Sequence, residues 1–228
     1  MTLSRQFTLQ FLYKKEIGKD TFSFYFSRPE EFAFLAGQYN RWTLPIMAAD
    51  GKGSSRFFTI SSSPFAGNFL TLTAKVGTSD FKKALLQIRE GDTISIFGPM
   101  GQLVLDETDT REKVFLAGGM GITPFYSMLI YASQKNLNLP FTLIAAFSFP
   151  EEAVFFEQLT GIVKAHPNIG FFYTRGISQG LIKKYVKNIP NSVFYIAGPP
   201  PMVKGVRKTL EELRIPEEDI RVEEFSGY

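Results

Sequence analysis

The stretch Val114–Pro124, with the sequence VFLAGGMGITP, has residue types and spacing suited to holding a dinucleotide. Its apolar start predicts a buried strand, and the glycines that follow allow a backbone to approach a phosphate closely. Thr123 is a suitable N-cap and Pro124 suits the first helical position, so a helix N-terminus would face the anion. The turn matches the pattern G-x-G-x-x-G, with Pro124 in place of the last glycine. A plain strand–turn–helix of an α/β domain is the alternative.

A second candidate ligand surface is the predicted strand Arg56–Ser62, which combines a cation, aromatic rings and hydroxyls. Alternation places Arg56 and Phe58 on one face and Thr59 on the other, unless the strand kinks or the Thr59 N–H contacts the ligand. Further on, Gly77, Thr78 and Ser79 precede a short predicted helix, which gives a second anion site at a helix N-terminus.

Composition excludes several kinds of chemistry. The chain has no cysteine, which excludes disulfides, thiolate catalysis, Cys-ligated zinc and an iron–sulfur cluster held by this chain. His166 is the single histidine, which excludes a multi-histidine metal site and argues against a His-based triad; we expect it on the surface. We therefore expect no metal.

Charge and hydropathy bear on partners and location. The net charge is +3, and the basic residues are scattered in short pairs. This favours phosphate-bearing ligands or an acidic partner, and it does not predict a nucleic-acid interface. The first residues lack the apolar run of a signal peptide, and no run reaches the roughly 18 apolar residues of a membrane span. We expect a cytoplasmic protein without a membrane span.

Hydrophobic periodicity changes near residue 109. Residues 1–108 predict a small β-barrel, because short alternating strands are separated by turn residues and interrupted by one helix at 79–88. Residues 109–228 predict an α/β domain with a parallel sheet covered on both faces, because strands and helices alternate. The polar segment 107–111 is the expected linker. The expected strands are 7–12, 21–26, 38–44, 56–61, 69–75, 93–97, 114–117, 141–147, 170–174, 193–197 and 220–223, and the later helices 124–135, 151–164, 179–187 and 201–213.

The order of the motifs along the chain carries a family resemblance. The barrel half contains, in order, R-F-F-T from residue 56, K-V-G from residue 75 before a helix, and G-P-M-G from residue 98. The second half contains G-G-M-G-I-T-P from residue 118, Y-I-A-G-P-P-P-M-V from residue 195 and a terminal aromatic residue. This order is similar to that of the ferredoxin–NADP reductase family, over essentially the whole chain. The resemblance implies a six-stranded antiparallel Greek-key barrel that binds a flavin, followed by an α/β domain with a parallel sheet that binds a nicotinamide dinucleotide.

The resemblance also implies roles in the barrel. Arg56 would pair with the flavin pyrophosphate, Phe58 would stack on the isoalloxazine where the family usually has Tyr, and Thr59 would approach flavin N5 as a catalytic residue. The pyrophosphate would receive donors from the start of the short helix. The implied cofactor-binding positions in this half are Arg56, Phe57, Phe58, Thr59, Ala74, Val76, Gly77, Thr78 and Ser79.

In the second domain the glycine turn would receive the nicotinamide dinucleotide, and Gly198–Pro200 would form the wall against which the nicotinamide lies. Ala197 stands where the family often has Cys. Glu151 and Glu152 follow the second strand and would repel a 2′-phosphate, which favours NADH, although Arg175 could still reach that phosphate. The implied cofactor-binding positions here are Gly119, Gly121, Ile122, Thr123, Pro124, Gly198, Pro199, Pro200 and Met202.

The tail EEFSGY contains two aromatic residues, Phe225 and Tyr228. By resemblance either one, and Tyr228 in particular as a catalytic residue, would cover the flavin where the nicotinamide lands; an exposed frayed end is the alternative. We expect Glu223 and Glu224 to be solvated.

Three functions are compatible with this sequence. The first is an oxidoreductase that transfers hydride from NADH or NADPH to bound FAD, with FMN as the less favoured flavin. It would pass electrons on to a ferredoxin- or flavodoxin-like protein on a separate chain, or to a small acceptor. The second is the electron-transfer subunit of a larger redox complex. The third is a non-catalytic barrel that binds a partner.

Overall fold

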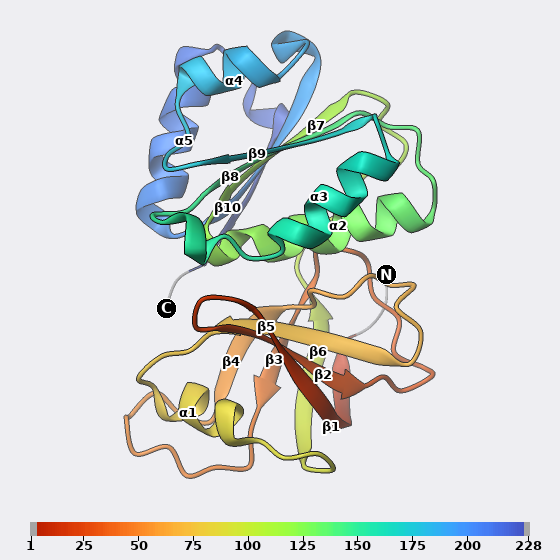
Figure 1. The fold of residues 1–228 in the computed structure, drawn as a ribbon, viewed down its shortest axis with the longest axis vertical. Helices are drawn as coiled ribbons and strands as arrows, with labels where there is room; N and C mark the ends of the chain where they lie inside the picture. The colour runs from red at the N-terminus through yellow and green to blue at the C-terminus, as the bar shows by residue number, and fades with distance from the viewer. Residues whose placement is uncertain (1–3, 226–228) are drawn as a thin grey trace.

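The computed structural model describes residues 4–225, which form two sheets stacked one above the other (Figure 1). The lower sheet holds the first six strands and a short helix, and the upper one holds five strands flanked by helices. The elements are β1 (Arg5–Gly18), β2 (Thr21–Ser27), β3 (Tyr39–Thr43), β4 (Ser55–Thr59), β5 (Phe69–Lys75), α1 (Asp80–Gln87), β6 (Thr93–Met100), β7 (Glu112–Gly118), α2 (Ile122–Gln134), β8 (Phe141–Ala146), α3 (Phe156–Ala165), β9 (Ile169–Thr174), α4 (Gln179–Tyr185), β10 (Ser192–Gly198), α5 (Pro200–Glu212) and β11 (Ile220–Glu224).

The first sheet is antiparallel with the order β4-β3-β6-β1-β2-β5, so β6 inserts between β3 and β1 as in a Greek key. Along β1, buried and solvent-facing side chains alternate, as in an amphipathic strand. Phe7, Leu9 and Phe11 are buried, whereas the residues between them face solvent. The two edge strands of this sheet, β4 and β5, approach each other near one isolated antiparallel β-bridge between Ile60 and Leu72. The sheet therefore curls into a barrel-like shape that is not closed by a continuous ladder, and the predicted six-stranded antiparallel fold is confirmed.

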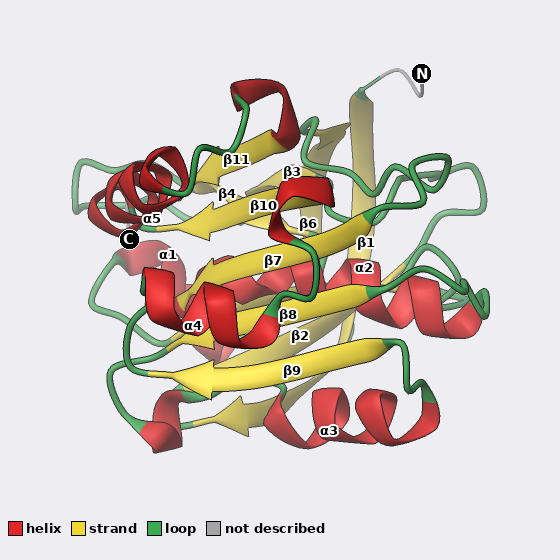
Figure 2. Ribbon diagram, turned by 90° about the horizontal axis from the view of Figure 1, so that it is seen from above, coloured by secondary structure: helices red, strands yellow, loops and turns green. Residues whose placement is uncertain are grey.

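The second sheet is parallel with the order β11-β10-β7-β8-β9. Both of its faces are covered, by α2 and α3 on one side and by α4 and α5 on the other (Figure 2). Alternate residues of one strand serve the two layers: Phe115 packs with the α2 side, and Val114 and Leu116 pack with α5. This is why the central strands read as continuous apolar runs.

The predicted domain boundary, between residues 108 and 109, lies in the segment between β6 and β7. Polar contacts outside this segment also join the two halves of the chain. Ser127 of α2 donates to the backbone oxygen of Ser62 at 2.7 Å. Lys75 at the end of β5 pairs with Glu152 of the second half at 2.6 Å. The division into 1–108 and 109–228 remains a prediction.

Three local predictions need correction. The helix expected at 124 begins at Ile122, with Gly121 rather than Thr123 at the N-cap. The helix expected from 151 begins at Phe156, because Pro150–Glu152 form a single 3-10 turn and Phe155 takes a left-handed backbone. His166 is half-buried and its Nε2 lies 2.7 Å from the hydroxyl of Ser133, so it is not simply a surface residue.

Candidate functional site

The carboxyl ends of β7 and β10 lie side by side at the point where the strand order reverses. From β7 the chain builds outward through β8 and β9, and then returns to place β10 on the other side of β7. Ala117 and Ala197 are direct partners in this pair, so the turns after Gly118 and Gly198 are neighbours. Open α/β sheets bind ligands in the crevice at such a reversal.

The glycines of the first turn have two distinct functions. Gly119 has φ +52° and nothing within 4 Å of the position that a Cβ would take, so it provides an open, left-handed corner. A Cβ on Gly121 would lie 2.1 Å from the backbone oxygen of Ala197. Gly121 is therefore required for close packing of the turn against β10, and Gly119 is the glycine whose surface faces open space.

The residues after this turn are mostly part of the packed core. Ile122 and Thr123 are buried, and the Thr123 hydroxyl donates to the Met120 oxygen at 2.9 Å instead of capping the helix. Pro124 is also buried, in the first turn of α2. Met202 packs against Gly118 from α5. For Ile122 and Thr123, only the backbone remains available to a ligand.

Strand β4 carries the predicted barrel residues. Arg56 donates through Nη1 to the oxygens of Lys52 and Gly53 at 2.7 and 2.9 Å, and its Nη2 lies 3.8 Å from Asp50. Phe57 is 59% exposed, whereas Phe58 is buried and its ring centroid lies 5.7 Å from that of Phe81. The alternation anticipated from the sequence is present.

The start of α1 lies close to this strand. Ser79 is the N-cap and accepts a hydrogen bond from the Lys82 amide at 3.4 Å. The Lys82 side chain folds over Gly77, with Cδ 2.8 Å from the position of a Cβ there. Burial, followed by the charge of Arg56, lowers the pKa of Lys82. Thr78 is exposed and Ala74 is buried in β5. Lys82 and Arg56 thus bring two cations to this corner, and the carboxylates of Asp50 and Asp80 lie beside them.

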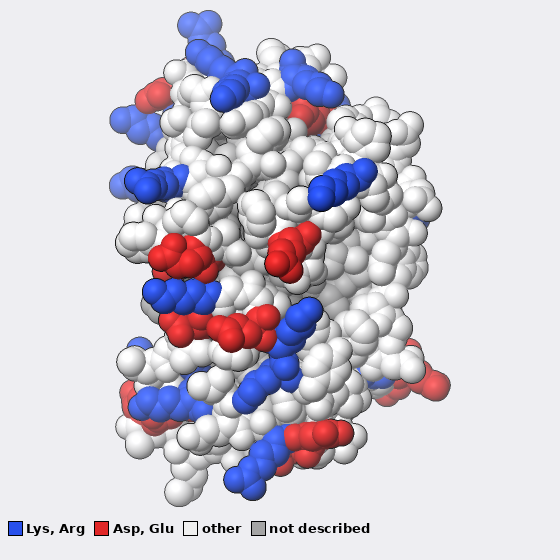
Figure 3. All heavy atoms as spheres, in the orientation of Figure 1, with Lys and Arg blue, Asp and Glu red and all other residues white. Residues whose placement is uncertain are grey.

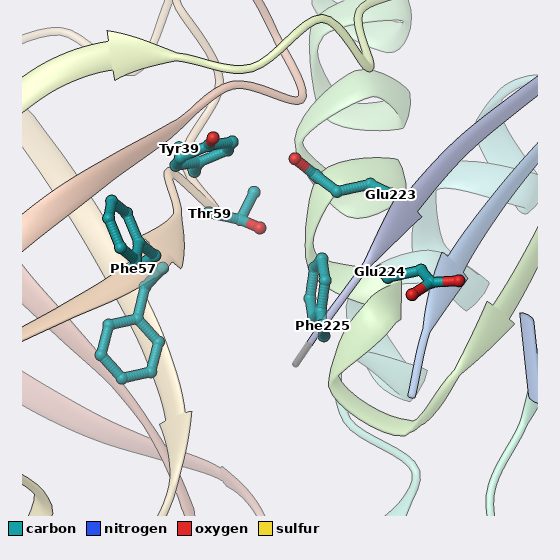
Figure 4. A pocket seen from close by; sticks show the side chains of 7 residues that line it. Tyr39, Phe57, Thr59, Glu223, Glu224 and Phe225 are labelled. Carbon is teal, nitrogen blue, oxygen red and sulfur yellow. The ribbon is translucent and has the colours of Figure 1, made fainter. Parts of the chain in front are cut away.

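A cavity of about 250 Å³ separates the barrel from the end of β11 (Figure 4). Thr59 and Tyr39 line it on the barrel side, and Glu223 and Phe225 line it on the other side, facing them. The Glu224 carboxylate points away from the barrel. The remaining lining residues are Phe57 and Phe58.

Glu223 is the residue that the sequence analysis missed. It was expected to be solvated, but burial raises its pKa to about 7, and Oε2 has no hydrogen-bond partner among the described residues. Its position follows from the edge pairing of β11 with β10, where Glu223 lies opposite Ala197. A paired-Glu motif alone gives no sign of this; the apolar Ile220 and Val222 before it predict a strand but not its neighbour.

A second cavity of about 260 Å³ lies at the glycine turn and shares one lining residue with the first. Phe225 borders both cavities, and its N–H donates to the Gly198 oxygen at 2.9 Å. Lys75 and Lys82 line it on the barrel side. The other lining residues are Val76, Gly118, Met120, Gly121 and Pro199. Gly119 and Pro200 fall outside the lining of both cavities, and Tyr228 lies outside the described residues.

Two buried side-chain oxygens of the first cavity, Thr59 Oγ1 and Glu223 Oε2, have no hydrogen-bond partner among the described residues. Arg56 Nη2, on the same strand as Thr59, also makes no hydrogen bond and has only the 3.8 Å ion pair with Asp50. Buried donors and acceptors are almost always satisfied, so unpaired ones around one cavity indicate an absent polar ligand. Together with the aromatic walls they suit a flat ring system with a polar edge and an anionic tail, which is the chemistry of a flavin nucleotide. Among the described residues, no group of His, Asp or Glu could hold a metal ion.

Charged side chains of both signs are mixed on one face of the molecule (Figure 3). On the face shown in Figure 3, Lys and Arg are interspersed with Asp and Glu, and no stripe of one sign runs across it. No helix within residues 4–225 is long and apolar enough to cross a membrane.

Comparisons with known proteins agree with this geometry. Residues 115–208 match the family described as oxidoreductase NAD-binding domain. A ferredoxin NADP+ reductase from Neisseria gonorrhoeae, solved with bound FAD and NADP, superposes with a TM-score of 0.81 at 24% identity, covering 96% of this chain and 98% of that one. The chain has the ferredoxin–NADP reductase-like fold.

Two further proteins extend the comparison, one similar in structure and one similar in sequence. The Amycolatopsis cytochrome P450 reductase GcoB superposes with a TM-score of 0.83 at 21% identity, over 97% of this chain and 70% of that one. The toluate 1,2-dioxygenase electron transfer component of Pseudomonas putida is 28% identical over 212 residues, which are 86% of this chain and 60% of that protein. The chain thus spans about 60% of the length of this curated relative.

Proposed function

We propose that this chain is a flavin-dependent oxidoreductase that passes hydride from a nicotinamide dinucleotide to FAD and then electrons to an acceptor on a separate chain. The observation that carries the proposal is the cavity in which Thr59 of the barrel faces Glu223 and Phe225 of the nucleotide domain, next to the glycine turn. A bound flavin would supply the hydride-accepting ring and the ability to release electrons singly.

The barrel residues would hold that flavin. Arg56 would pair with the pyrophosphate, because a guanidinium binds such oxygens through two N–H groups, and the start of α1 would add backbone donors from Gly77 to Ser79. Phe57 offers an exposed aromatic ring at the cavity, whereas Phe58 also lines the cavity but is buried against Phe81. Thr59 has an unpaired buried hydroxyl to direct at the reacting edge of the ring.

The second domain would position the dinucleotide. The crevice at Gly118–Gly121 would receive its pyrophosphate, and Gly198–Pro200 would form the wall beside the nicotinamide. Phe225 stands between this crevice and Thr59, so its ring must move or share the space when the nicotinamide arrives. Glu223 carries a carboxyl that is half protonated near pH 7 and can hold or release a proton at the same cavity.

The preferred dinucleotide is NADH. Glu151 and Glu152 lie beyond β8, where the 2′-phosphate of NADPH would meet negative charge. The Lys75–Glu152 pair neutralises one of these carboxylates, so Glu151 is the better candidate for repulsion.

The relatives include electron transfer and reductase components of oxygenases, which supports an acceptor protein on another chain. The cytoplasmic location stays a prediction, which fractionation of the producing cells would test.

The decisive experiment is anaerobic reduction of the purified protein by NADH and by NADPH, followed through the visible absorbance of the flavin. We expect a yellow protein that NADH bleaches faster than NADPH does. A colourless protein that takes up neither FAD nor FMN would contradict the proposal. Reduction without transfer to ferredoxin-like acceptors or to small dyes would contradict the electron-transfer step.

A further inference from the structure

A separate cavity lies between the two domains, away from the proposed flavin site. It has a volume of about 380 Å³ and lies where α2 and the start of α3 face β2 and β5 of the barrel (Figure 1). None of its lining residues lines the two cavities described above. The barrel contributes Tyr25, Ala66 and Phe69 among others, and the nucleotide domain contributes Tyr126, Ile130 and Phe155 among others.

No Lys, Arg, His, Asp or Glu lines this cavity. Its barrel wall includes hydroxyls that already bond to one another or to backbone: Ser61 Oγ lies 2.9 Å from Thr71 Oγ1, and Ser62 Oγ accepts the Thr71 amide at 3.1 Å. A charged ligand would therefore lose its hydration without gaining a counter-charge, which is costly. The cavity suits an uncharged occupant.

Polar side chains that could make further hydrogen bonds also line the cavity. The hydroxyls of Tyr25 and Tyr126, and the side-chain amides of Gln134 and Gln158, make no hydrogen bond within the described residues, although all four side chains line the cavity. Burial raises the pKa of Tyr126, so its hydroxyl stays protonated and can donate. These groups could bond a hydroxyl or carbonyl on a ligand.

Aromatic rings form the remaining walls. Tyr126 and Phe155 are stacked with ring centroids 3.6 Å apart and planes at 8°, and Phe69 packs on Tyr25 at 5.3 Å. Such faces favour a flat aromatic ring over a flexible chain.

The backbone of Phe155 is strained, because φ is +61° at a bulky residue that has a Cβ. It occupies the N-cap position of α3 without making a cap hydrogen bond. Strained backbone of this kind persists where the surroundings fix it, and it clusters at binding sites. Here the strain places the Phe155 ring flat on Tyr126 at the wall of the cavity.

We propose that this interdomain cavity is a binding site for a small, uncharged aromatic molecule that carries a hydrogen-bonding group. Its volume falls in the range of roughly 300–1,000 Å³ that ligand pockets occupy. An occupant would contact both domains at once, so binding would also favour the arrangement in which the two domains are docked.

The experiment uses 2-naphthol as the probe and the purified flavin-bound protein, with binding measured by isothermal titration calorimetry. We expect saturable binding at one site. The control compound is 2-naphthalenesulfonate, which has the same ring with a fixed negative charge. It is expected to bind at least about tenfold more weakly, since no cation lines the cavity. Equal binding of the two compounds would overturn the proposal.

Two variants locate the site. Ala66→Trp and Ile130→Trp fill the cavity from opposite walls, and each is expected to weaken 2-naphthol binding at least about tenfold. Ala165→Trp adds the same side chain at an exposed position at the end of α3 and is expected to leave binding unchanged. Unchanged binding in both filling variants, or no saturable binding in the unmodified protein, would contradict the proposal. Flavin content and reduction by NADH, measured on the same samples, separate this outcome from a failure of the proposed function.

Discussion

Glu223 and Tyr39 face each other across the gap between the two domains, and both lie against Gly101. Glu223 Oε1 is 3.6 Å, and the Tyr39 ring 2.9 Å, from the position that a Cβ on Gly101 would take. The carboxyl raises the pKa of Tyr39, after the larger effect of burial. A titrating carboxyl therefore lies on the nucleotide-domain side of the proposed flavin cavity, opposite the strand that carries Thr59.

Changing Glu223 should alter the pH dependence of stability. Its pKa rises from 4.5 to about 7 on folding, so between these values the folded chain binds more protons than the unfolded chain. The free energy of unfolding therefore falls as pH rises through this window. Glu223→Gln should remove that slope in urea titrations at several pH values. Glu224→Gln, whose carboxylate points away from the barrel, should keep it; identical slopes in the wild type and Glu223→Gln would contradict the assignment.

The two glycines of the turn should respond differently to alanine. Gly121→Ala forces a Cβ against the Ala197 oxygen and should cost about 3 kcal/mol of stability, measured by chemical unfolding. Gly119→Ala has free space and should cost only about 1 kcal/mol through its positive φ, while weakening dinucleotide affinity if that surface binds the phosphates. Gly205→Ala, in α5 with nothing nearby, is the control and should be neutral or stabilising. Equal losses at 119 and 121 would contradict this division.

Arg56→Ala should lower flavin retention, because the guanidinium would no longer pair with the pyrophosphate. Arg56 also holds the carbonyls of the loop at 52–53, so a loss of flavin could follow from a disordered loop. Arg56→Lys keeps the charge but not the two-pronged geometry, and it should retain flavin at an intermediate level. Visible absorbance per protein after gel filtration measures the effect; undiminished flavin in Arg56→Ala would move the pyrophosphate elsewhere.

Glu151→Arg should shift the preference from NADH toward NADPH. Glu151 is exposed and has no ion pair among the described residues, whereas Glu152 is bonded to Lys75. Reversing its charge replaces repulsion of a 2′-phosphate by attraction. The ratio of kcat/KM for the two dinucleotides measures the shift, which we expect at about tenfold. Glu157→Arg, in the first turn of α3, is the charge-matched control; a similar shift there would indicate a general effect of net charge.

Much of the fold could be predicted from the hydrophobic pattern of the sequence, because the two sheets differ in that pattern. Phe7, Leu9 and Phe11 alternate as a half-buried strand must, and the apolar run at 114–117 marks a strand covered on both faces. The start of α2 was misplaced because Thr123 and Pro124 are a strong capping pair, whereas tertiary packing of Gly121 on β10 begins the helix earlier.

The site was only partly accessible to such reasoning. The glycine turn is predicted by residue type and spacing, whereas Arg56 and Thr59 are predicted by the order of the motifs and the family resemblance it carries. Glu223 is identified only by where β11 pairs, since its raised pKa arises from burial between two domains that are distant in sequence. The cavity around Tyr126 is likewise formed by segments about a hundred residues apart and has no motif.

The hydrogen bond from Ser127 to the Ser62 oxygen has a consequence for exchanging domains between proteins of this fold. Ser62 lies three residues beyond Thr59, and Ser127 lies in the helix that the glycine turn begins. Contacts between the two domains, this hydrogen bond and the Lys75–Glu152 ion pair among them, therefore help to set the distance between the two proposed ligand sites. In a hybrid protein joined at the linker, the alignment of the two sites would depend on whether the new barrel places a backbone carbonyl at the position of Ser62 and a cation at that of Lys75.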